Sequence, residues 1–439
     1  MILAALASAL TAQAQLSIEG SESMPCAVPQ NMGYTTVYVV RDGASATLRF
    51  ASSRPGALWE RFSNLGAAYA EPVPGVRHDG NVSSVAAGTA DMGYRITEAD
   101  GSVTYFWVVN YANHRFGVTS LAVDPSASDC GSVMLAVTGE AGPINCYGIT
   151  GRPHVLERDM ELFYQTLEYD SSAEDFRQTG VTRSLASAGA LVSAPAPLCD
   201  TRFTLSPDRF SRQWYPNVGD AVTDSYTAIA VDARTTAVQT ETDYDNEQKS
   251  EAEGGALGGS APCEITFRAA VSDAAIYRRW EISSTPDFAD IDLSYDQLEF
   301  THTFTDAGTV YVRFTADNAG ATCPYEGEAY QISIGESRLQ CPNAFSPGAS
   351  EGVNDEWKVS YRSIESFDCQ IFNRWGKRLA TLTHPSQGWD GKVGGKVVPA
   401  GVYFYVIKAR GSDGKDYNLS GDINVINSRR GNSPSAPVE

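Results

Sequence analysis

The residues best suited to catalysis are spread along this sequence without the spacing that enzymes use. No Gly-x-Ser-x-Gly elbow, no His-Glu-x-x-His zinc helix and no phosphate-binding glycine loop before a helix occurs. With 53 acidic residues in the chain, a pair of carboxylates that could serve a glycosidase is uninformative. The histidines, which lack metal-ligand spacing, are His78, His114, His154, His302 and His384. The sequence therefore predicts a protein that is not an enzyme and holds no cofactor or metal.

The eight cysteines form the other set of reactive side chains, and no two of them make a Cys-x-x-Cys pair. In an exported chain such cysteines are more often disulfides than metal ligands. Each disulfide would stabilise its domain by roughly 2–4 kcal/mol. Pairing neighbours within the expected domains gives Cys26–Cys130, Cys146–Cys199, Cys263–Cys323 and Cys341–Cys369.

One acidic stretch alternates as the ligands of a calcium loop do, through Asp243, Asp245 and Glu247. The turn glycine and the distal bidentate glutamate of such a loop are missing. A Gly-rich run follows, and the whole of 241–261 is interpreted as an acidic, Gly-rich linker with nothing to bury.

Composition and charge narrow the class of protein. Hydrophobic residues make up 42% and charged residues 20% of the 439 residues, which indicates globular folding. The formal net charge is −20, and no basic stripe offsets it. Because this charge repels phosphate backbones, the sequence predicts no nucleic-acid partner and disfavours docking on bare anionic lipid.

The N-terminal residues are interpreted as a signal peptide over 1–14. They are apolar, too short to span a bilayer, and end in Ala12-Gln13-Ala14, a small-x-small cleavage pattern. Because no Lys or Arg precedes the apolar run, the true start codon could lie upstream. Cys26 lacks the small preceding residues of a lipobox, and no later segment approaches a transmembrane span.

Strand signals dominate the rest of the chain. Two hairpins are expected, one joining 35–40 to 46–50 through Asp42-Gly43 and one joining 94–96 to 103–109 through Asp100-Gly101. The best helical candidate, 158–164, fits a strand equally well. Many short strands separated by Gly, Pro and Asp-Gly predict an all-β fold of serial, immunoglobulin-like β-sandwich domains.

The expected domains follow from these strands. A β-sandwich domain is expected over 27–140, with Trp59 and Trp107 in its core, and a second β domain over 144–240. After the linker, a third domain spans 262–337, with a strand over 277–282 and Trp280 at its centre. This third domain resembles an immunoglobulin-like module of the polycystic-kidney-disease (PKD) type. The matching positions are Thr303, Phe304, Gly308, Tyr311 and Val312.

The most informative segment is 341–428. Phe367, Cys369 and Ile371 fall on one face of an expected strand, whereas 402–407 is apolar on both faces, which predicts a strand covered on both sides. The segment carries a series of motif residues in fixed order: Asn343, Phe345, Pro347, Asn354, Asp355, Asn373, Arg374, Trp375, Gly376, Trp389, Asp390, Gly391, Gly401 and Tyr403.

This order of motifs closely resembles the gliding-motility-associated C-terminal domain, the type B sorting domain of the type IX secretion system in Bacteroidetes. The resemblance implies export across both membranes to the cell surface or the medium. It also implies two partners, the type IX translocon and an outer-membrane protein resembling PorP/SprF. The chain departs from the family at 348–352, which replaces an Asn-Gly-Asp-Gly loop, and in a Pro/Ser-rich tail over 429–439 that is expected to be disordered.

Individual motif residues have competing interpretations. Trp375 and Trp389 are expected in the core, and Asp355 as a turn cap. Asn373 and Arg374 are candidates for an exposed recognition surface, because burial of such a pair is unfavourable, and a purely structural role is the equal alternative.

Three hypotheses for function remain open. The first is an exported structural or interaction protein. The second is an adhesin with a glycan or protein ligand bound in 27–240, where Tyr94, Tyr111 or Trp214 could form a sugar platform although each fits a core position. The third is an unrecognised hydrolase in the same region.

Overall fold

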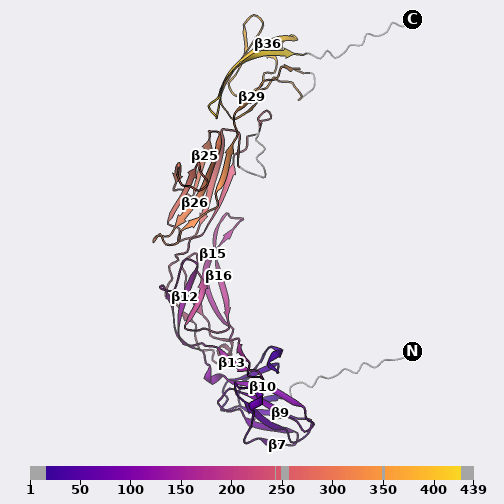
Figure 1. Cartoon of the computed structure of the whole chain (residues 1–439), viewed down its shortest axis with the longest axis vertical. Helices are drawn as coiled ribbons and strands as arrows, with labels where there is room; N and C mark the ends of the chain where they lie inside the picture. The colour runs from indigo at the N-terminus through magenta and orange to yellow at the C-terminus, as the bar shows by residue number, and fades with distance from the viewer. Residues whose placement is uncertain (1–15, 243, 249–256, 349–351, 427–439) are drawn as a thin grey trace, which may run out of the picture. The chain divides into compact units, whose positions relative to one another are not determined.

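The computed structural model describes residues 16–242, 244–248, 257–348 and 352–426. The predicted signal peptide, Asp243 and the tail over 429–439 lie outside these residues. The chain divides into two compact units: the first runs to residue 230 without 169–176, and the second comprises 169–176 and the chain from 231 onwards. Strands dominate both units, so the all-β prediction is confirmed (Figure 1).

The first unit begins with a sandwich of two sheets. The four-stranded sheet, in the order β1-β4-β8-β7, consists of β1 (Leu16–Glu19), β4 (Thr47–Ala51), β7 (Arg77–Asp79) and β8 (Val82–Ala86). The six-stranded sheet, in the order β2-β3-β10-β9-β5-β6, consists of β2 (Ser23–Ala27), β3 (Thr36–Val40), β5 (Leu58–Phe62), β6 (Glu71–Pro72), β9 (Met92–Thr97) and β10 (Val103–Asn110). Trp59 and Trp107 are buried in its two apolar clusters, as predicted.

One of the two expected hairpins is confirmed and the other is wrong. β9 and β10 pair antiparallel across Asp100-Gly101, where Gly101 has a φ of 89° that favours glycine. β3 and β4 are not paired, because β3 lies between β2 and β10 while β4 lies between β1 and β8. The loop between β3 and β4 connects one sheet to the other. A hydrogen bond from Gly43 N to Asn110 Oδ1 (2.8 Å) holds this loop in place.

The rest of the first unit holds three smaller sheets. One, β11-β12-β17, consists of β11 (Gly117–Asp124), β12 (Ser132–Glu140) and β17 (Leu191–Pro195); another is the pair β13 (Ile144–Tyr147) and β14 (Pro153–Leu156). The third, β16-β15-β18-β19, consists of β15 (Met160–Asp170), β16 (Asp175–Leu185), β18 (Thr204–Leu205) and β19 (Ala221–Val222); the tips of β15 and β16 belong to the second unit.

Helix is scarce, and it does not form where the best helical candidate lay. Residues 160–164 belong to β15, whereas α1 (Arg209–Trp214) is the α-helix of the described residues. Asp208 is its N-cap and accepts a hydrogen bond from Ser211 N (2.7 Å), which starts the helix. Three short 3-10 helices cover Gln30–Met32, Ala67–Tyr69 and Tyr111–Asn113.

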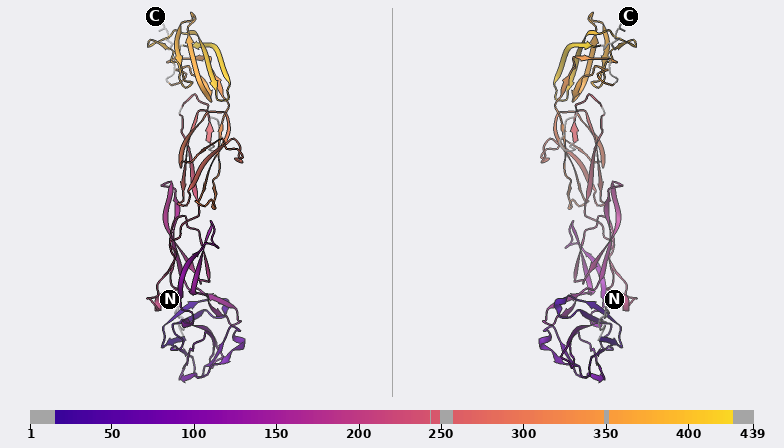
Figure 2. Two further views of the ribbon diagram at one scale, coloured as in Figure 1. Left: turned by 90° about the vertical axis from the view of Figure 1, so that its left-hand side faces the viewer. Right: turned by 90° about the vertical axis from the view of Figure 1, so that its right-hand side faces the viewer.

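The third domain, residues 233–334, is a sandwich of two sheets (Figure 2). The three-stranded sheet consists of β20 (Ala233–Gln239), β22 (Cys263–Val271) and β25 (Glu299–Phe304), in the order β20-β22-β25. The other sheet, β21-β28-β26-β23-β24 with β27 on β26, consists of β21 (Leu257–Gly259), β23 (Tyr277–Ser283), β24 (Leu293–Tyr295), β26 (Gly308–Asp317), β27 (Tyr325–Glu326) and β28 (Tyr330–Ile334). Trp280 is fully buried and packs on Phe267 and Phe314, as the central-strand prediction requires.

The C-terminal domain, residues 338–426, is built on a five-stranded sheet in the order β30-β37-β36-β32-β33. Its strands are β30 (Ala344–Phe345), β32 (Ile364–Phe372), β33 (Arg378–Leu382), β36 (Gly401–Gly411) and β37 (Asp416–Val425). The pairs β29 (Arg338–Gln340) with β31 (Ser360–Arg362) and β34 (Lys392–Val393) with β35 (Lys396–Val397) complete it. Phe367, Cys369 and Ile371 are buried on one face of β32, as predicted.

The predicted disulfide scheme is wrong. Cys130 and Cys323 are disulfide-bonded, but their predicted partners Cys26 and Cys263 are free thiols. Cys146 is likewise a thiol, which removes the predicted bond to Cys199, and so are Cys341 and Cys369. Pairing cysteines that are neighbours in the sequence gave the wrong bonds, because these neighbours lie in different parts of the fold. Cys26 is buried against the Arg209 guanidinium (3.2 Å), whereas Cys130 follows the turn after β11.

Candidate functional site

The aromatic motif residues of the C-terminal domain build its core. Phe345 and Trp389 are buried with ring centroids 5.4 Å apart, and Trp389 packs edge-on against Tyr403 at the same separation. Trp389 lies in the core as predicted. These three rings join β30 and β36 to the loop before β34, so they shape the domain and offer little surface to a partner.

A second group of motif residues closes the loop after β30. The Asp355 carboxylate accepts hydrogen bonds from Gly348 N (2.9 Å) and Gly352 N (2.7 Å). Ser346 N donates to the Asn354 carbonyl (2.9 Å), and Asn354 takes a φ of 55°. Asp355 is therefore committed to backbone amides.

Other motif residues order nearby backbone in the same way. The Asn343 carbonyl accepts from Asn424 N (2.9 Å) on β37, and Asp390 Oδ1 accepts from Lys392 N (2.9 Å). Pro347 and Gly391 lie in loops, whereas Gly401 is the first residue of β36. Gly391 packs against the Phe345 ring in a turn with a φ of 70°.

Trp375 is exposed and not part of the core, which corrects the prediction. The turn after β32 is held by Asn373, whose Oδ1 accepts from Trp375 N and Lys377 N, both at 3.0 Å. Gly376 completes this turn with a φ of 77°. The turn leaves the Trp375 side chain 75% exposed, with the Arg374 guanidinium 4.3 Å from its ring centroid. The sequence signal that distinguishes Trp375 is its place inside a tight Asn-x-x-Gly turn, where side chains point away from the sheet.

A groove runs beside this turn. Its volume is about 400 Å³. It is lined by Asn373, Arg374, Trp375, Leu379, Val393, Val398 and the strand entry from Pro399 to Tyr403. Most of these side chains are apolar, and the guanidinium of Arg374 supplies a positive charge at the edge.

The outer face of β36 continues the apolar surface. Val402, Phe404 and Val406 are 47%, 43% and 44% exposed. The prediction that both faces of this strand are covered is therefore wrong, since the apolar cluster packs only on the Tyr403 and Ile407 side. Because Val402 also lines the groove, the groove and the outer face of β36 form one surface, called here the β36 surface.

The charge of the C-terminal domain differs from that of the chain before it. Residues 338–426 hold eleven Lys or Arg and nine Asp or Glu, a net charge of +2. Residues 1–337 hold twenty basic and forty-three acidic residues, a net charge of −23. A partner with acidic character would therefore be repelled by most of the chain but not by this domain.

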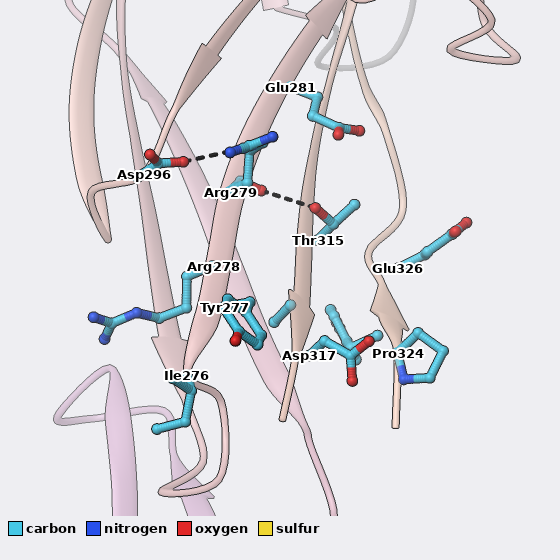
Figure 3. Close-up of a pocket in the computed structure, with 12 residues that line it drawn as sticks. Ile276, Tyr277, Arg278, Arg279, Glu281, Asp296, Thr315, Asp317, Pro324 and Glu326 are labelled. Carbon is cyan, nitrogen blue, oxygen red and sulfur yellow. Dashed lines mark hydrogen bonds and ion pairs between the residues drawn. The ribbon is translucent and has the colours of Figure 1, made fainter. Parts of the chain in front are cut away.

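The third domain carries an open pocket on the outer face of its larger sheet (Figure 3). Its volume is about 630 Å³. Tyr277, 58% exposed, lies opposite Asp317 in the register of β23 and β26. Next to it, Arg279 Nε donates to Asp296 Oδ1 (3.1 Å). Glu281 follows Arg279 along β23, and Glu326 lies across the pocket on β27. The pocket thus combines an aromatic ring with charged groups able to bind hydroxyls.

The sugar platform expected in the first two domains is not formed. Tyr94, Tyr111 and Trp214 are all buried, which is the core placement that the sequence also allowed. The Tyr111 hydroxyl donates to Asp208 Oδ1 (2.7 Å) and accepts from Phe116 N (3.2 Å). Tyr277 was not among the residues predicted from sequence, although its alternation with the buried Trp280 and Ile282 along β23 is the signal that places it on the outer face of the sheet.

The acidic residues between β20 and β21 contact other protein groups in this structure. Asp245 pairs with Lys358 (3.2 Å), and Glu247 Oε2 accepts from the Thr242 hydroxyl (2.9 Å). Across the residues described, no three His, Cys, Asp or Glu side chains gather in a way that could hold a metal ion. In the same part of the chain, no helix has the length and hydropathy needed to cross a membrane.

Comparison with protein families decides the identity of the C-terminal domain. Residues 339–424 match the family described as the CHU_C type IX secretion signal domain. This domain is a type IX secretion signal domain. It is here called the signal domain, and it implies interaction with the secretion machinery, export, and a cell-surface or extracellular location. The sequence resemblance is thereby confirmed at the level of the family.

A second family match lies before the signal domain. Residues 122–223 match the fibronectin type III domain, an immunoglobulin-like β-sandwich. Domains of these two kinds are typically non-catalytic. The PKD-type resemblance of 262–337 and the predicted domain boundaries are not tested by these matches and stay predictions.

Solved structures give distant likenesses, and curated proteins give none: no curated protein matches the chain. A tetra-tandem repeat in the extending region of a large adhesion protein is 11% identical, covering 88% of this chain and 97% of its own, with a TM-score of 0.19. Three N-terminal domains of the bacteriophage RB49 Hoc capsid protein are 8% identical over 70% and 99% (TM-score 0.22). Dimeric latent PorU from Porphyromonas gingivalis is 11% identical over 74% and 35% (TM-score 0.15).

Proposed function

We propose that this protein is a structural or interaction protein of the cell surface, and that a PorP/SprF-like outer-membrane protein recognises its signal domain through the β36 surface. The observation that carries the proposal is the exposed Trp375 beside an apolar groove, on a domain whose family is a type IX secretion signal. Large exposed apolar patches on soluble proteins mark interaction sites.

The composition of the β36 surface suits a binding site. Trp and Arg are enriched among the residues that contribute most to binding, and here Arg374 stacks on Trp375. The turn held by Asn373 fixes the backbone that carries both side chains before a partner arrives, which lowers the entropy lost on binding. Phe404 and Val406 extend the surface along the strand, so a partner with a complementary apolar face could cover them together.

Cell fractionation tests both levels of the proposal. Deletion of 339–439 should trap the protein in the periplasm, and normal surface arrival of that truncation would contradict a role of this domain in export.

The variant Trp375→Ala should lower the surface-displayed fraction about tenfold, the effect of losing about 1.4 kcal/mol of binding free energy. Leu58→Ala, at an exposed apolar residue of the first unit, is the matched control.

A second candidate function is an adhesin that binds a glycan in the pocket of the third domain. It is favoured by the exposed ring of Tyr277 beside the Arg279–Asp296 pair, because sugars stack on aromatic rings and bond to charged side chains through hydroxyls. A glycan array probed with the protein and with Tyr277→Ala tests it. If no glycan binds either protein, or if the protein and Tyr277→Ala bind equally, this candidate function is contradicted.

A further inference from the structure

A segment that precedes the larger sheet of the third domain lies on the signal domain. The chain leaves the third domain at the end of β20 and returns to it at β21, which pairs with β28. Between these strands, residues 244–248, called here the strap, contact residues more than a hundred positions further along the chain. Both partners belong to the second compact unit.

The strap pairs with the signal domain through its backbone. Gln248 N donates to the Tyr361 carbonyl (2.7 Å), and Tyr361 N donates to the Asn246 carbonyl (3.1 Å). These two bonds make a parallel bridge between Glu247 and Tyr361 on β31. Since β29 pairs with the opposite edge of β31, the strap adds one bridge at the edge of β31 that β29 leaves open.

Four side chains of the strap, those of Tyr244, Asp245, Asn246 and Gln248, add further contacts. Asn246 Nδ2 donates to two carbonyls of the signal domain, those of Val359 (2.7 Å) and Pro385 (2.8 Å). Gln248 Nε2 donates to the Ser360 hydroxyl (2.8 Å). Asp245 pairs with Lys358, which the neighbouring Glu356 also contacts (3.5 Å). The Tyr244 ring lies 5.5 Å from the imidazole of His384 between centroids.

Removal of the strap would leave buried polar groups of the signal domain without partners. Val359 and Tyr361 are both buried, and the strap binds the carbonyl of the first and both backbone groups of the second. Buried backbone groups of this kind are nearly always paired, because an unpaired one loses its hydration without compensation. Without the strap, the signal domain therefore lacks hydrogen-bond partners for buried backbone groups of Val359 and Tyr361.

A second cluster ties the two domains together independently of the strap. Ser363, fully buried, donates its hydroxyl to the Gly335 carbonyl (2.7 Å) and accepts from Ala261 N (3.1 Å). Its own N–H donates to the Ser260 hydroxyl (2.9 Å). Each of these bonds joins the signal domain to a residue before it, so the domains meet through a specific polar joint.

We propose that the export signal of this protein is a composite unit of the third domain and the signal domain, in which the strap completes the signal domain. Recognition by the secretion machinery then requires a folded third domain as well as residues 339–424. The proposal rests on the export role of the signal domain, but not on the β36 surface or its partner.

The test keeps the full chain and replaces Tyr244–Gln248 by a Gly-Ser segment of equal length. A second variant, Asn246→Ala with Gln248→Ala, removes only side-chain bonds, and Gln331→Ala, an exposed amide of the third domain, is the matched control. The first readout is amide hydrogen exchange at Tyr361, which should become at least tenfold faster in the replacement. The amide of Trp280 should stay protected, which shows that the third domain remains folded.

The second readout is the fraction of protein at the cell surface, which should fall at least fivefold in the replacement and not in Gln331→Ala. Unchanged exchange at Tyr361 would overturn the strap as part of the signal domain. Faster exchange with normal surface arrival would overturn the composite signal. Trp375→Ala tests the β36 surface separately, because Trp375 lies in the turn after β32 whereas the strap bonds to Val359, Tyr361 and Pro385.

Discussion

At the scale of single residues, polar side chains of this chain mostly organise backbone. Asn373, a recognition candidate from sequence, and Asp355, expected as a turn cap, both hold turns through main-chain amides. The same is true of Asp208, which caps α1 and also receives the Tyr111 hydroxyl. The residues available to bind a partner are therefore those exposed by these turns, such as Trp375 in the turn that Asn373 holds.

The buried pair of Arg158 and Asp208 is the most demanding of these arrangements. Arg158 Nε donates to Asp208 Oδ2 (2.7 Å), and its other nitrogens donate to the carbonyls of Gly142 (2.8 Å) and His114 (2.6 Å). Both side chains are almost wholly buried. The guanidinium is therefore tolerated in the interior only because every side of it has an acceptor.

Asp208→Ala should lower the free energy of unfolding of the first unit by about 3–5 kcal/mol, because it leaves the Arg158 charge buried and unpaired. Urea denaturation followed by tryptophan fluorescence measures this. Asp220→Ala, at an exposed residue of the same unit, should change it by less than about 0.5 kcal/mol. A loss below about 1 kcal/mol for Asp208→Ala would show that the pair contributes little.

At the scale of elements, β36 shows how one strand serves both stability and recognition. Successive side chains of a strand point to opposite faces. Tyr403 and Ile407 therefore pack in the core, while Val402, Phe404 and Val406 stay exposed. The apolar outer face adds nothing to the packed core, which is why a binding role explains it better than folding does.

Substitutions at Ile407 and Phe404, both on β36, test the stabilising role and the binding role separately. Ile407→Ala should destabilise the signal domain by about 2–5 kcal/mol, because it opens a cavity among fully buried side chains. Phe404→Thr should change stability by less than about 1 kcal/mol, yet lower surface display. Thermal unfolding and cell fractionation of both variants give the comparison, and equal destabilisation by the two would contradict the assignment of faces.

At the scale of the whole molecule, charge and cysteine chemistry divide the chain. The acidic residues concentrate before position 338, while the signal domain carries a slight positive charge. Cys130 and Cys323 are disulfide-bonded, whereas Cys341 and Cys369 are thiols of the signal domain core. Burial raises the pKa of the Cys369 thiol to about 12, so it stays protonated and unreactive at neutral pH.

Alkylation of the purified, unreduced protein under denaturing conditions checks this distribution. Peptide mass spectrometry should find the alkylating group on Cys341 and Cys369 and not on Cys130 or Cys323. In the native protein Cys369 should react at least tenfold more slowly than in the denatured one, because it is buried and protonated. If neither Cys341 nor Cys369 is alkylated, the disulfide predicted between them from sequence would be supported instead.

The sequence alone determined the local features of this protein. Alternation placed Trp280, Phe367 and Ile371 in cores, and Asp100-Gly101 marked a true hairpin, because period-two burial and positive-φ turns act within a few residues. The ordered motifs of the last domain likewise identified its family.

Only the tertiary structure decided what depends on distant partners. It separated β3 from β4, exposed Trp375, and brought the strap to β31, since each outcome depends on which sheet or loop lies alongside. A charged, Gly-rich linker such as 241–261 is interpreted from sequence as solvated. It becomes structural when another domain offers unpaired carbonyls such as that of Val359 to its amides.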